Sequence, residues 1–418
     1  MVTVIGLGFV GLTTALGIAE LGTPVFGYEI DSEKATRIKE QMAVISELHL
    51  REQLRHKLGK RFFVTDDLQH AVRQSNCIIL CVGTPCQDDG SVDLEQVISA
   101  VKSCLDHIPD DKVHRTITIK STVPPGTCKN VVEPLIRDRG FSDDLVSVAS
   151  NPEFLREGCC WEDFMHPGRI VIGAENGDSV QSLRRLYEKL DTQLYIVSPS
   201  TAEYSKYLSN VMLATLISFS NEMAHVASVF QDVDVMEAFR CLHDDSRLKN
   251  SGIKSYLYPG CGYGGYCLPK DILAFTAALQ DAGYCSELLQ AVISINDAAA
   301  ERICERVSQQ VRETDTVGIL GLAFKPETDD VRDSAAARII RGLVSRGYNN
   351  LTAFDPLANE AFRRRYPDLP VRYCDTAKAV VESADAVIIA TAWNSFRLLD
   401  YSNTILIDGR YMIEEKNK

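Results

Sequence analysis

The sequence predicts an α/β protein with two doubly wound sheets joined by a long central helix. Short apolar runs alternate with helical segments over the first part of the chain and again after residue 312, as they do when parallel strands are connected through helices. Between these regions, residues 200–230 contain neither glycine nor proline and repeat apolar residues at helical spacing. We therefore expect three parts: residues 1–198, 199–305 and 306–418.

Composition excludes several classes of protein. The 418 residues are 45% hydrophobic and 24% charged, and the net charge of −13 argues against nucleic acid as a partner. We find no apolar run long enough for a membrane span. Thirteen cysteines without framework spacing indicate reduced thiols and a cytoplasmic location. His-x-x-x-His and Cys-x-x-Cys pairs are absent, so we expect no metal site.

The first element is a buried strand over residues 2–5, followed by a glycine turn and a helix. Gly6, Gly8 and Gly11 form a G-x-G-x-x-G pattern. Such glycines permit the tight turn, the approach of a pyrophosphate to the backbone and close packing of the helix on the strand. The pattern predicts a Rossmann-like dinucleotide site.

The second strand, PVFGYEID, carries Glu29, which lies eighteen residues after Gly11. A carboxylate there accepts hydrogen bonds from ribose hydroxyls and repels a 2′-phosphate, which favours NAD over NADP. The alternative is that Glu29 is a solvated turn residue. We place Lys34 in the same group of cofactor contacts.

Three further strands are predicted in NCIILCVGTP, TITIKSTVPPG and LVSVASNPEF, as the fourth, fifth and sixth. Thr84 and Thr122 follow the first two of these, at the edge where an open parallel sheet receives its ligand. An ordinary turn role explains either threonine equally well.

The central helix carries Lys206 and Asn210, which are one turn apart and share a face. At roughly 45 Å the helix is long enough to connect two domains and also to pair with a second copy of the chain. A lysine among apolar residues often only extends its stem along them, which is the alternative for Lys206.

The alternating pattern restarts with DTVGILGLAFKP, LTAFDP and ADAVIIATAW, which we interpret as three strands of a second nucleotide-binding-like domain. Its first turn replaces the dinucleotide glycines with a charged segment that contains Lys325 and Arg332. These cations suit a phosphate or a nucleotide. A surface ion-pair cluster is the alternative.

Residues 260–271, GCGYGGYCLPKD, place four glycines and a proline around Cys267 and end in Lys270 and Asp271. A single cysteine is most often inert packing. The family resemblance of the whole chain changes that interpretation.

Six stretches, in this order, resemble the nucleotide-sugar dehydrogenase family, also called the UDP-glucose/GDP-mannose dehydrogenase family, and within it the branch that acts on UDP-glucose. They are IGLGFVG (5–11), STVPPGT (121–127), NPEFLREG (151–158), EYSKYLSN (203–210), GYGGYCLPKD (262–271) and GLAFKPETDDVRDS (321–334).

The resemblance implies oxidation of the C6 alcohol of a UDP-sugar to a carboxylate, with NAD as the oxidant. Cys267 would capture the aldehyde as a thiohemiacetal, and the resulting thioester would be hydrolysed. Lys206 and Asn210 would stabilise the oxyanion. Asp271 and Thr122 would position water or relay protons, and Glu157 would be the general base.

The resemblance also implies the ligand contacts. Those of the cofactor are Gly6, Gly8, Gly11, Glu29, Lys34, Thr84, Thr122 and Arg332, with the substrate phosphate as a second candidate partner of Arg332. Those of the substrate are Glu153, Phe154, Leu155, Arg156, Lys206, Asn210, Tyr256, Gly264 and Lys325.

Two departures from the family pattern bear on specificity. Ser251 stands where the UDP-glucose branch has an arginine that reaches the partner subunit's sugar, with Arg247, Lys249 and Lys254 nearby. The stretch EQMAVISELHLREQL lacks the family's proline-glycine turn. The alternatives are therefore a GDP-mannose or UDP-N-acetylhexosamine dehydrogenase of the same family, a hydroxyacid dehydrogenase, or a catalytically silent nucleotide-binding protein.

Overall fold

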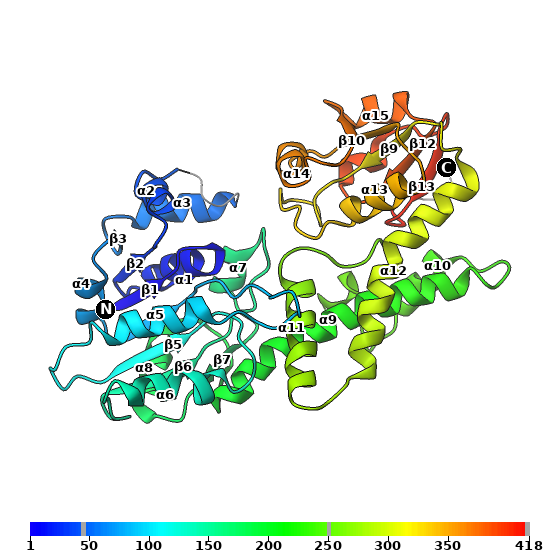
Figure 1. Cartoon of the computed structure of the whole chain (residues 1–418). Coiled ribbons are helices and arrows are strands. Elements are labelled where there is room, and N and C mark those ends of the chain that lie inside the picture. The colour runs from blue at the N-terminus through cyan, green and yellow to red at the C-terminus, as the bar shows by residue number, and fades with distance from the viewer. Residues whose placement is uncertain (43–46, 249–251, 414–418) are drawn as a thin grey trace. The chain divides into compact units, whose positions relative to one another are not determined.

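The computed structural model describes residues 1–42, 47–248 and 252–413 (Figure 1). The chain divides into two compact units, Met1–Leu208 and Ser209–Lys418. Each unit contains one sheet with helices packed on both faces, so the predicted α/β class with two doubly wound domains is confirmed. Among the described residues, no helix is long and apolar enough to cross a membrane.

The sheet of the first unit has eight strands in the order β3-β2-β1-β4-β5-β6-β7-β8. Its first six positions follow the order of dinucleotide-binding folds. Strands β7 and β8 extend the sheet, with β7 antiparallel to β6, and the sequence analysis did not anticipate them. The strands are β1 (Val2–Ile5), β2 (Val25–Tyr28), β3 (Phe62–Thr65), β4 (Cys77–Leu80), β5 (Arg115–Ile119), β6 (Val146–Ser150), β7 (Ile170–Gly173) and β8 (Leu194–Val197).

Helices cover both faces of this sheet because successive strand residues point to opposite sides. Val4 and Ile79 belong to the core beneath α1, α3 and α7, whereas Ile5 and Ile78 belong to the core beneath α4, α5 and α6. The helices are α1 (Phe9–Glu20), α2 (Ser32–Lys39), α3 (Leu48–Lys57), α4 (Leu68–Arg73), α5 (Glu95–Leu105), the π-helical turn η1 (Cys128–Val132), α6 (Glu133–Asp138), α7 (Cys160–Met165) and α8 (Gly177–Tyr187).

The predicted central helix is α9 (Pro199–Ala227), which begins in the first unit and ends in the second. A second long helix, α12 (Glu287–Gln310), was not predicted, and it runs through the boundary that we expected between residues 305 and 306. The shorter helices between them are α10 (Val235–His243), η2 (Gly252–Ser255) and α11 (Cys267–Asp281).

The sheet of the second unit has five parallel strands in the order β11-β10-β9-β12-β13. We expected ADAVIIATAW to be the third strand, but it is the fourth along the chain, because the short, partly exposed β11 gives almost no apolar signal. The strands are β9 (Val317–Leu320), β10 (Leu351–Phe354), β11 (Val371–Tyr373), β12 (Ala386–Ile389) and β13 (Ile405–Asp408). The helices are α13 (Ala335–Ser345), α14 (Asn359–Arg365), α15 (Ala377–Ser383) and η3 (Asn394–Leu398).

Candidate active site

The glycine turn after β1 is shaped by two close approaches of the backbone. Gly6 has φ +84°, and a Cβ on it would lie 2.8 Å from the carbonyl oxygen of Cys81. A Cβ on Gly11 would lie 1.8 Å from the carbonyl oxygen of Gly6, so any side chain there would push α1 away from the turn. Gly8 caps α1 without a side-chain hydrogen bond, which leaves the first amides of the helix available to an anion.

Glu29 lies beside this turn, just beyond the end of β2. Its Oε2 accepts the Leu7 amide at 2.9 Å and pairs with the Lys34 ammonium at 2.8 Å, while Oε1 accepts the Asp31 amide at 3.2 Å. Only 7% of the Glu29 side chain is exposed. The fold thus brings Glu29 and Lys34 together with the three glycines, and a dinucleotide fits this cradle.

The two predicted threonines follow neighbouring strands. Thr84 is buried in the loop after β4, and Thr122 is half-buried in the loop after β5. Ser121 holds the two loops together, because its hydroxyl donates to the Val82 carbonyl oxygen at 2.7 Å.

Glu153, which follows β6, forms a buried ion pair with Lys206. The Lys206 ammonium donates to Oε1 at 2.7 Å, and the Leu155 amide donates to Oε2 at 2.5 Å. Burial acts to raise the pKa of Glu153, but attraction to Lys206, these hydrogen bonds and the charge of Lys120 outweigh it, so the pKa is lowered. Glu153 is therefore an anion fixed beside Lys206.

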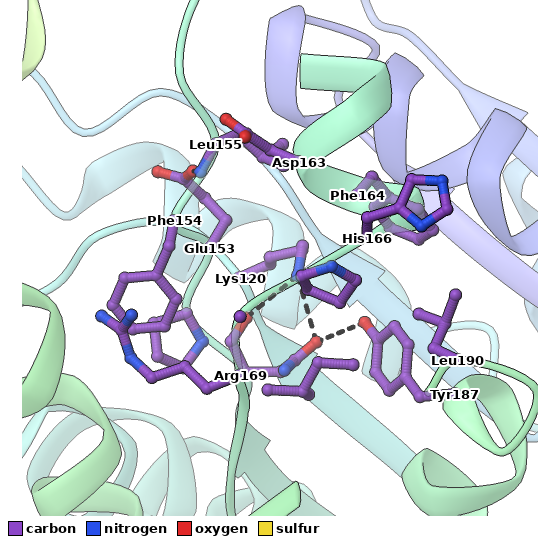
Figure 2. A pocket seen from close by; sticks show the side chains of 15 residues that line it. Lys120, Glu153, Phe154, Leu155, Asp163, Phe164, His166, Arg169, Tyr187 and Leu190 are labelled. Carbon is purple, nitrogen blue, oxygen red and sulfur yellow. Dashed lines mark hydrogen bonds between the residues drawn. The ribbon is translucent and has the colours of Figure 1, made fainter. Parts of the chain in front are cut away.

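Glu153 is one of the residues that line a cavity of about 140 Å³ (Figure 2). Lys120 lines it, 5% exposed, and donates to Asn151 Oδ1 at 3.1 Å, which also accepts the Tyr187 hydroxyl at 2.6 Å. Burial lowers the pKa of Lys120. The sequence analysis missed Lys120, although it directly precedes STVPPGT and a lysine at the end of a buried strand is itself a signal.

Arg169, another lining residue of this cavity, was also missed. Its guanidinium lies 3.8 Å from the centroid of the Phe154 ring (Figure 2). The Lys206 ammonium lies 5.7 Å from the same ring. Phe154 is thus held beside two cations.

Two other residues of NPEFLREG are placed differently. Arg156 forms an ion pair with Asp163 at 2.7 Å with 61% of its side chain exposed, so the structure does not gather it with Glu153 and Lys206. Glu157 is half-buried in the turn that follows.

In the second unit, Cys267 is the exposed first residue of α11. The helix has no side-chain cap, and its first amide groups and the positive end of its dipole are at this end of the helix. One turn later, Asp271 accepts hydrogen bonds from Lys270 at 2.5 Å and from Asn210 at 2.6 Å. Burial acts to lower the pKa of Lys270, but Asp271 outweighs it and the pKa is raised.

The loop that leads to Cys267 packs on the charged turn after β9. A Cβ on Gly264 would lie 2.2 Å from the Asp333 carbonyl oxygen, and the Gly265 amide donates to the Arg332 carbonyl oxygen at 2.9 Å. The Arg332 guanidinium pairs with Asp330 at 2.7 Å and lies 4.4 Å from the centroid of the Tyr266 ring. This arrangement places Arg332 beside the cysteine loop.

The remaining predicted residues are less closely tied to these groups. The Lys325 ammonium lies 5.5 Å from the centroid of the Phe324 ring. Tyr256 is half-buried after η2, where its amide donates to Ile253. Ser251 and Lys249, together with residues 43–46 of the stretch without a proline-glycine turn, lie outside the described residues.

No group of three side chains with metal-ligand geometry occurs among the described residues. Of the predicted residues, the glycine turn, Glu29, Thr122, Glu153 and Lys206 belong to the first unit, and Asn210, Cys267, Asp271 and Arg332 belong to the second.

Three family models match consecutive parts of the chain. Residues 1–191 match the NAD-binding domain, residues 200–298 the central domain and residues 318–415 the UDP-binding domain of one family. The chain belongs to the UDP-glucose/GDP-mannose dehydrogenase family. The resemblance drawn from the sequence motifs is confirmed, and so are NAD as the cofactor and a nucleotide sugar as the class of substrate.

Relatives in this dehydrogenase family match along nearly their whole length. The UDP-glucose 6-dehydrogenase AglM of Haloferax volcanii is 34% identical over 99% of this chain and 97% of its own. The UDP-glucose 6-dehydrogenase of Pseudomonas aeruginosa is 35% identical over 97% and 92%.

Solved structures of this family are also similar. A UDP-glucose dehydrogenase from Pyrobaculum islandicum has a TM-score of 0.93 at 36% identity and covers 100% of this chain and 95% of its own. A UDP-D-ManNAc dehydrogenase from Pyrococcus horikoshii has a TM-score of 0.86 at 27% identity, with 99% and 96% covered.

Proposed function

We propose that this protein oxidises the C6 alcohol of UDP-glucose to the carboxylate of UDP-glucuronate. The observation that carries the proposal is Cys267, exposed at the start of α11. One turn later, Asp271 is held by Lys270 and by Asn210 of α9. A simple alcohol dehydrogenase does not require such a nucleophile. The similarity to UDP-glucose dehydrogenases supports the choice of sugar.

NAD⁺ supplies the hydride acceptor for both oxidations, one molecule for each. Its pyrophosphate would be held by the amides at the start of α1, because Gly6, Gly8 and Gly11 leave room there, and its ribose by Glu29. Lys34, Thr84, Thr122 and Arg332 are the other proposed cofactor contacts.

Cys267 divides the reaction into two oxidations. Its thiolate adds to the C6 aldehyde and forms a C–S bond, and the resulting hemithioacetal oxygen is stabilised by Lys206 and Asn210. The second oxidation leaves a thioester. Water then attacks the carbonyl carbon, the C–S bond breaks, and Cys267 recovers its thiol while the carboxylate leaves.

Hydrolysis requires a group that takes a proton from water. Asp271 is held by Lys270 and Asn210, so its oxygens have a fixed orientation toward the first turn of α11. We propose that Asp271 and Thr122 position the water and that Glu157 accepts the proton. Glu153 serves instead as the anion that orients Lys206, because its lowered pKa keeps it ionised.

The sugar nucleotide would contact the residues after β6, the central helix and the cysteine loop. The proposed contacts are Glu153, Phe154, Leu155, Arg156, Lys206, Asn210, Tyr256, Gly264 and Lys325. We assign NAD binding to residues 1–198, the nucleophile and subunit pairing to 199–305, and binding of UDP to 306–418.

We propose a homodimer formed through α9. Exposed or half-exposed apolar residues recur on it at alternating steps of three and four: Met212, Leu216, Phe219, Met223 and Val226. This spacing lets one helix pack along another, and a second copy offers the same stripe. Phe219→Glu should convert a dimer to a monomer in light scattering, whereas Glu237→Gln on α10 should not; an unchanged mass would remove α9 from the interface.

We also propose that the protein works in a reducing compartment such as the cytoplasm, because its thirteen cysteines are present as thiols.

The test of the function is the number of NADH formed per sugar, measured by absorbance with UDP-glucose limiting and NAD⁺ in excess. Two NADH per sugar are expected. One would contradict the thioester route and point to an ordinary alcohol dehydrogenase. None with UDP-glucose, but two with GDP-mannose or a UDP-N-acetylhexosamine, would transfer the same chemistry to another member of the family. None with any sugar nucleotide would favour the silent binding protein.

A further inference from the structure

The motif EYSKYLSN contains a carboxylate that the proposed reaction does not use. Glu203 lies on α9 one turn before Lys206, and only 2% of it is exposed. A buried carboxylate is costly unless strong donors surround it. Burial raises the pKa of Glu203, and backbone amides act against this rise. The position of those amides shows what the residue holds.

Both oxygens of Glu203 accept hydrogen bonds from the loop that follows β5. Oε2 accepts the Gly126 amide at 2.5 Å, and Oε1 accepts the Cys128 amide at 2.8 Å. Hydrogen bonds to a charged acceptor are roughly twice as strong as neutral ones. Two of them join the start of α9 to a loop that lies 77 residues away in the sequence.

The loop has a shape that directs these amides toward Glu203. The Thr127 amide donates to the Pro124 carbonyl oxygen at 3.1 Å, with Pro125 at the second position and Gly126 at the third with φ +94°. These are the features of a type II turn, in which the third residue requires a positive φ. The π-helical turn η1 begins directly after it, at Cys128.

Thr122 lies between two anchors of this loop. At its start, the Ser121 hydroxyl donates to the Val82 carbonyl oxygen at 2.7 Å. At its far end, Glu203 holds Gly126 and Cys128. One turn further along α9, Lys206 holds Glu153 in the loop after β6. The first turns of α9 therefore fix the loops after two neighbouring strands.

We propose that Glu203 is a positioning residue, which fixes the Thr122 loop to the turn of α9 that carries Lys206. The inference rests on the function proposed above, because Thr122 matters only if it contacts cofactor or water. A displaced reacting group can reduce catalysis by roughly a hundredfold without any change in the chemical groups. Loss of Glu203 should thus act on turnover more than on sugar binding, because the proposed sugar contacts Glu153 and Lys206 remain paired with each other.

The experiment compares Glu203→Ala and Glu203→Gln with the wild type in steady-state kinetics with UDP-glucose. Glutamine keeps one oxygen that can accept one of the two backbone amides, whereas its side-chain NH2 group faces the other amide and cannot accept from it. We expect kcat to fall by roughly a hundredfold in Glu203→Ala and roughly tenfold in Glu203→Gln, with KM for UDP-glucose within about twofold. Asp234→Asn is the matched control, because Asp234 accepts two amides at the start of α10.

A second readout needs no substrate. Hydrogen exchange at the Gly126 and Cys128 amides should accelerate at least tenfold in Glu203→Ala and remain unchanged in Asp234→Asn. A wild type that forms no NADH would contradict the proposed function, and exchange would still show whether Glu203 holds the loop. An active wild type with unaltered kcat in Glu203→Gln, or variants that raise KM and leave kcat unchanged, would overturn the inference. If Glu203→Ala does not fold, Glu203→Gln decides.

Discussion

The two sheets of this protein begin with the same local arrangement and use it differently. In the first, β1 is followed by Gly6 with φ +84°, and β2 is followed by Glu29. In the second, β9 is followed by Gly321 with φ +94°, and β10 is followed by Asp355. Each carboxylate accepts the amide of the residue after that glycine, Leu7 or Leu322. The turn is thus the same, but its partners are not.

Asp355 is fully engaged by its own domain. Its two oxygens accept five hydrogen bonds, from the amides of Leu322, Ala323, Leu357 and Ala358 and from the Trp393 indole, and 2% of it is exposed. Glu29 accepts hydrogen bonds from two backbone amides and forms an ion pair with the Lys34 ammonium.

The glycines differ in the same way. Ala323 and Pro326 stand where the first unit has Gly8 and Gly11. A proline cannot donate an amide hydrogen bond, and a Cβ occupies space that a pyrophosphate would need. The comparison teaches that the turn of the first unit keeps the glycines that a dinucleotide needs, whereas the turn of the second unit stabilises its own domain.

The largest expected effect separates the chemistry from cofactor binding. Cys267→Ser should reduce UDP-glucuronate formation at least about a thousandfold, because a hydroxyl is not ionised near neutral pH, while the Kd for NAD stays within about twofold. A product assay measures the first effect, and isothermal titration with NAD measures the second. Cys285→Ser, at another exposed cysteine, is the control and should be fully active. Unchanged product formation in Cys267→Ser would show that Cys267 is not the nucleophile.

The next effect concerns stability. Asp355→Ala should reduce the free energy of unfolding of the second unit by about 3–5 kcal/mol, because four buried donors and one partly buried donor lose their acceptor. Denaturant titration followed by Trp393 fluorescence checks it. Glu29→Ala is the matched variant and should lower the free energy of unfolding by much less. Equal losses of unfolding free energy in the two variants would show that Glu29 and Asp355 stabilise their units to the same extent.

Glu29→Ala should instead weaken NAD binding about tenfold, or about 1.4 kcal/mol, through the lost contacts with the ribose. Isothermal titration with NAD measures this change. The affinity for UDP should stay the same, which serves as the internal control. An unaltered NAD affinity would make Glu29 a structural residue like Asp355.

The smallest expected effect is that of Ala323→Gly. Restoring a glycine should cost about 0.5–1 kcal/mol of stability through chain entropy and should not create NAD binding in the second unit, because Asp355 remains saturated. Thermal unfolding of Ala323→Gly and the stoichiometry of NAD binding to it test both points. Binding of a second NAD per chain would show that Ala323 alone had excluded the cofactor.

Most of the fold followed from local signals. The buried strands, the glycine turn of the first unit and the central helix are visible because their apolar periodicity or glycine spacing repeats within a few residues. The strands β8 and β11 were missed because they are short and partly exposed and lack such a repeat, and β7 was missed although all four of its residues are buried. The helix α12 was missed although it is long.

The candidate site shows a similar division. Sequence motifs named Glu153, Lys206, Cys267 and Asp271; the structure pairs Glu153 with Lys206, and Asp271 with Lys270. The roles of Lys120, Arg169 and Glu203 depend on contacts across loops and elements, such as the 77 residues between Glu203 and Gly126. A sequence motif does not show which residues that are far apart in the sequence come into contact in the fold.

The sequence by itself determined the family, the order of its parts and the residue types that carry its chemistry, because each is encoded in a short motif. Only the tertiary structure decided that Glu29 accepts two amides and the Lys34 ammonium whereas Asp355 accepts five hydrogen bonds, and that Glu203 joins α9 to the Thr122 loop. The physical reason is that the number of donors around a carboxylate is set by which backbone amides the fold brings within about 3 Å of it.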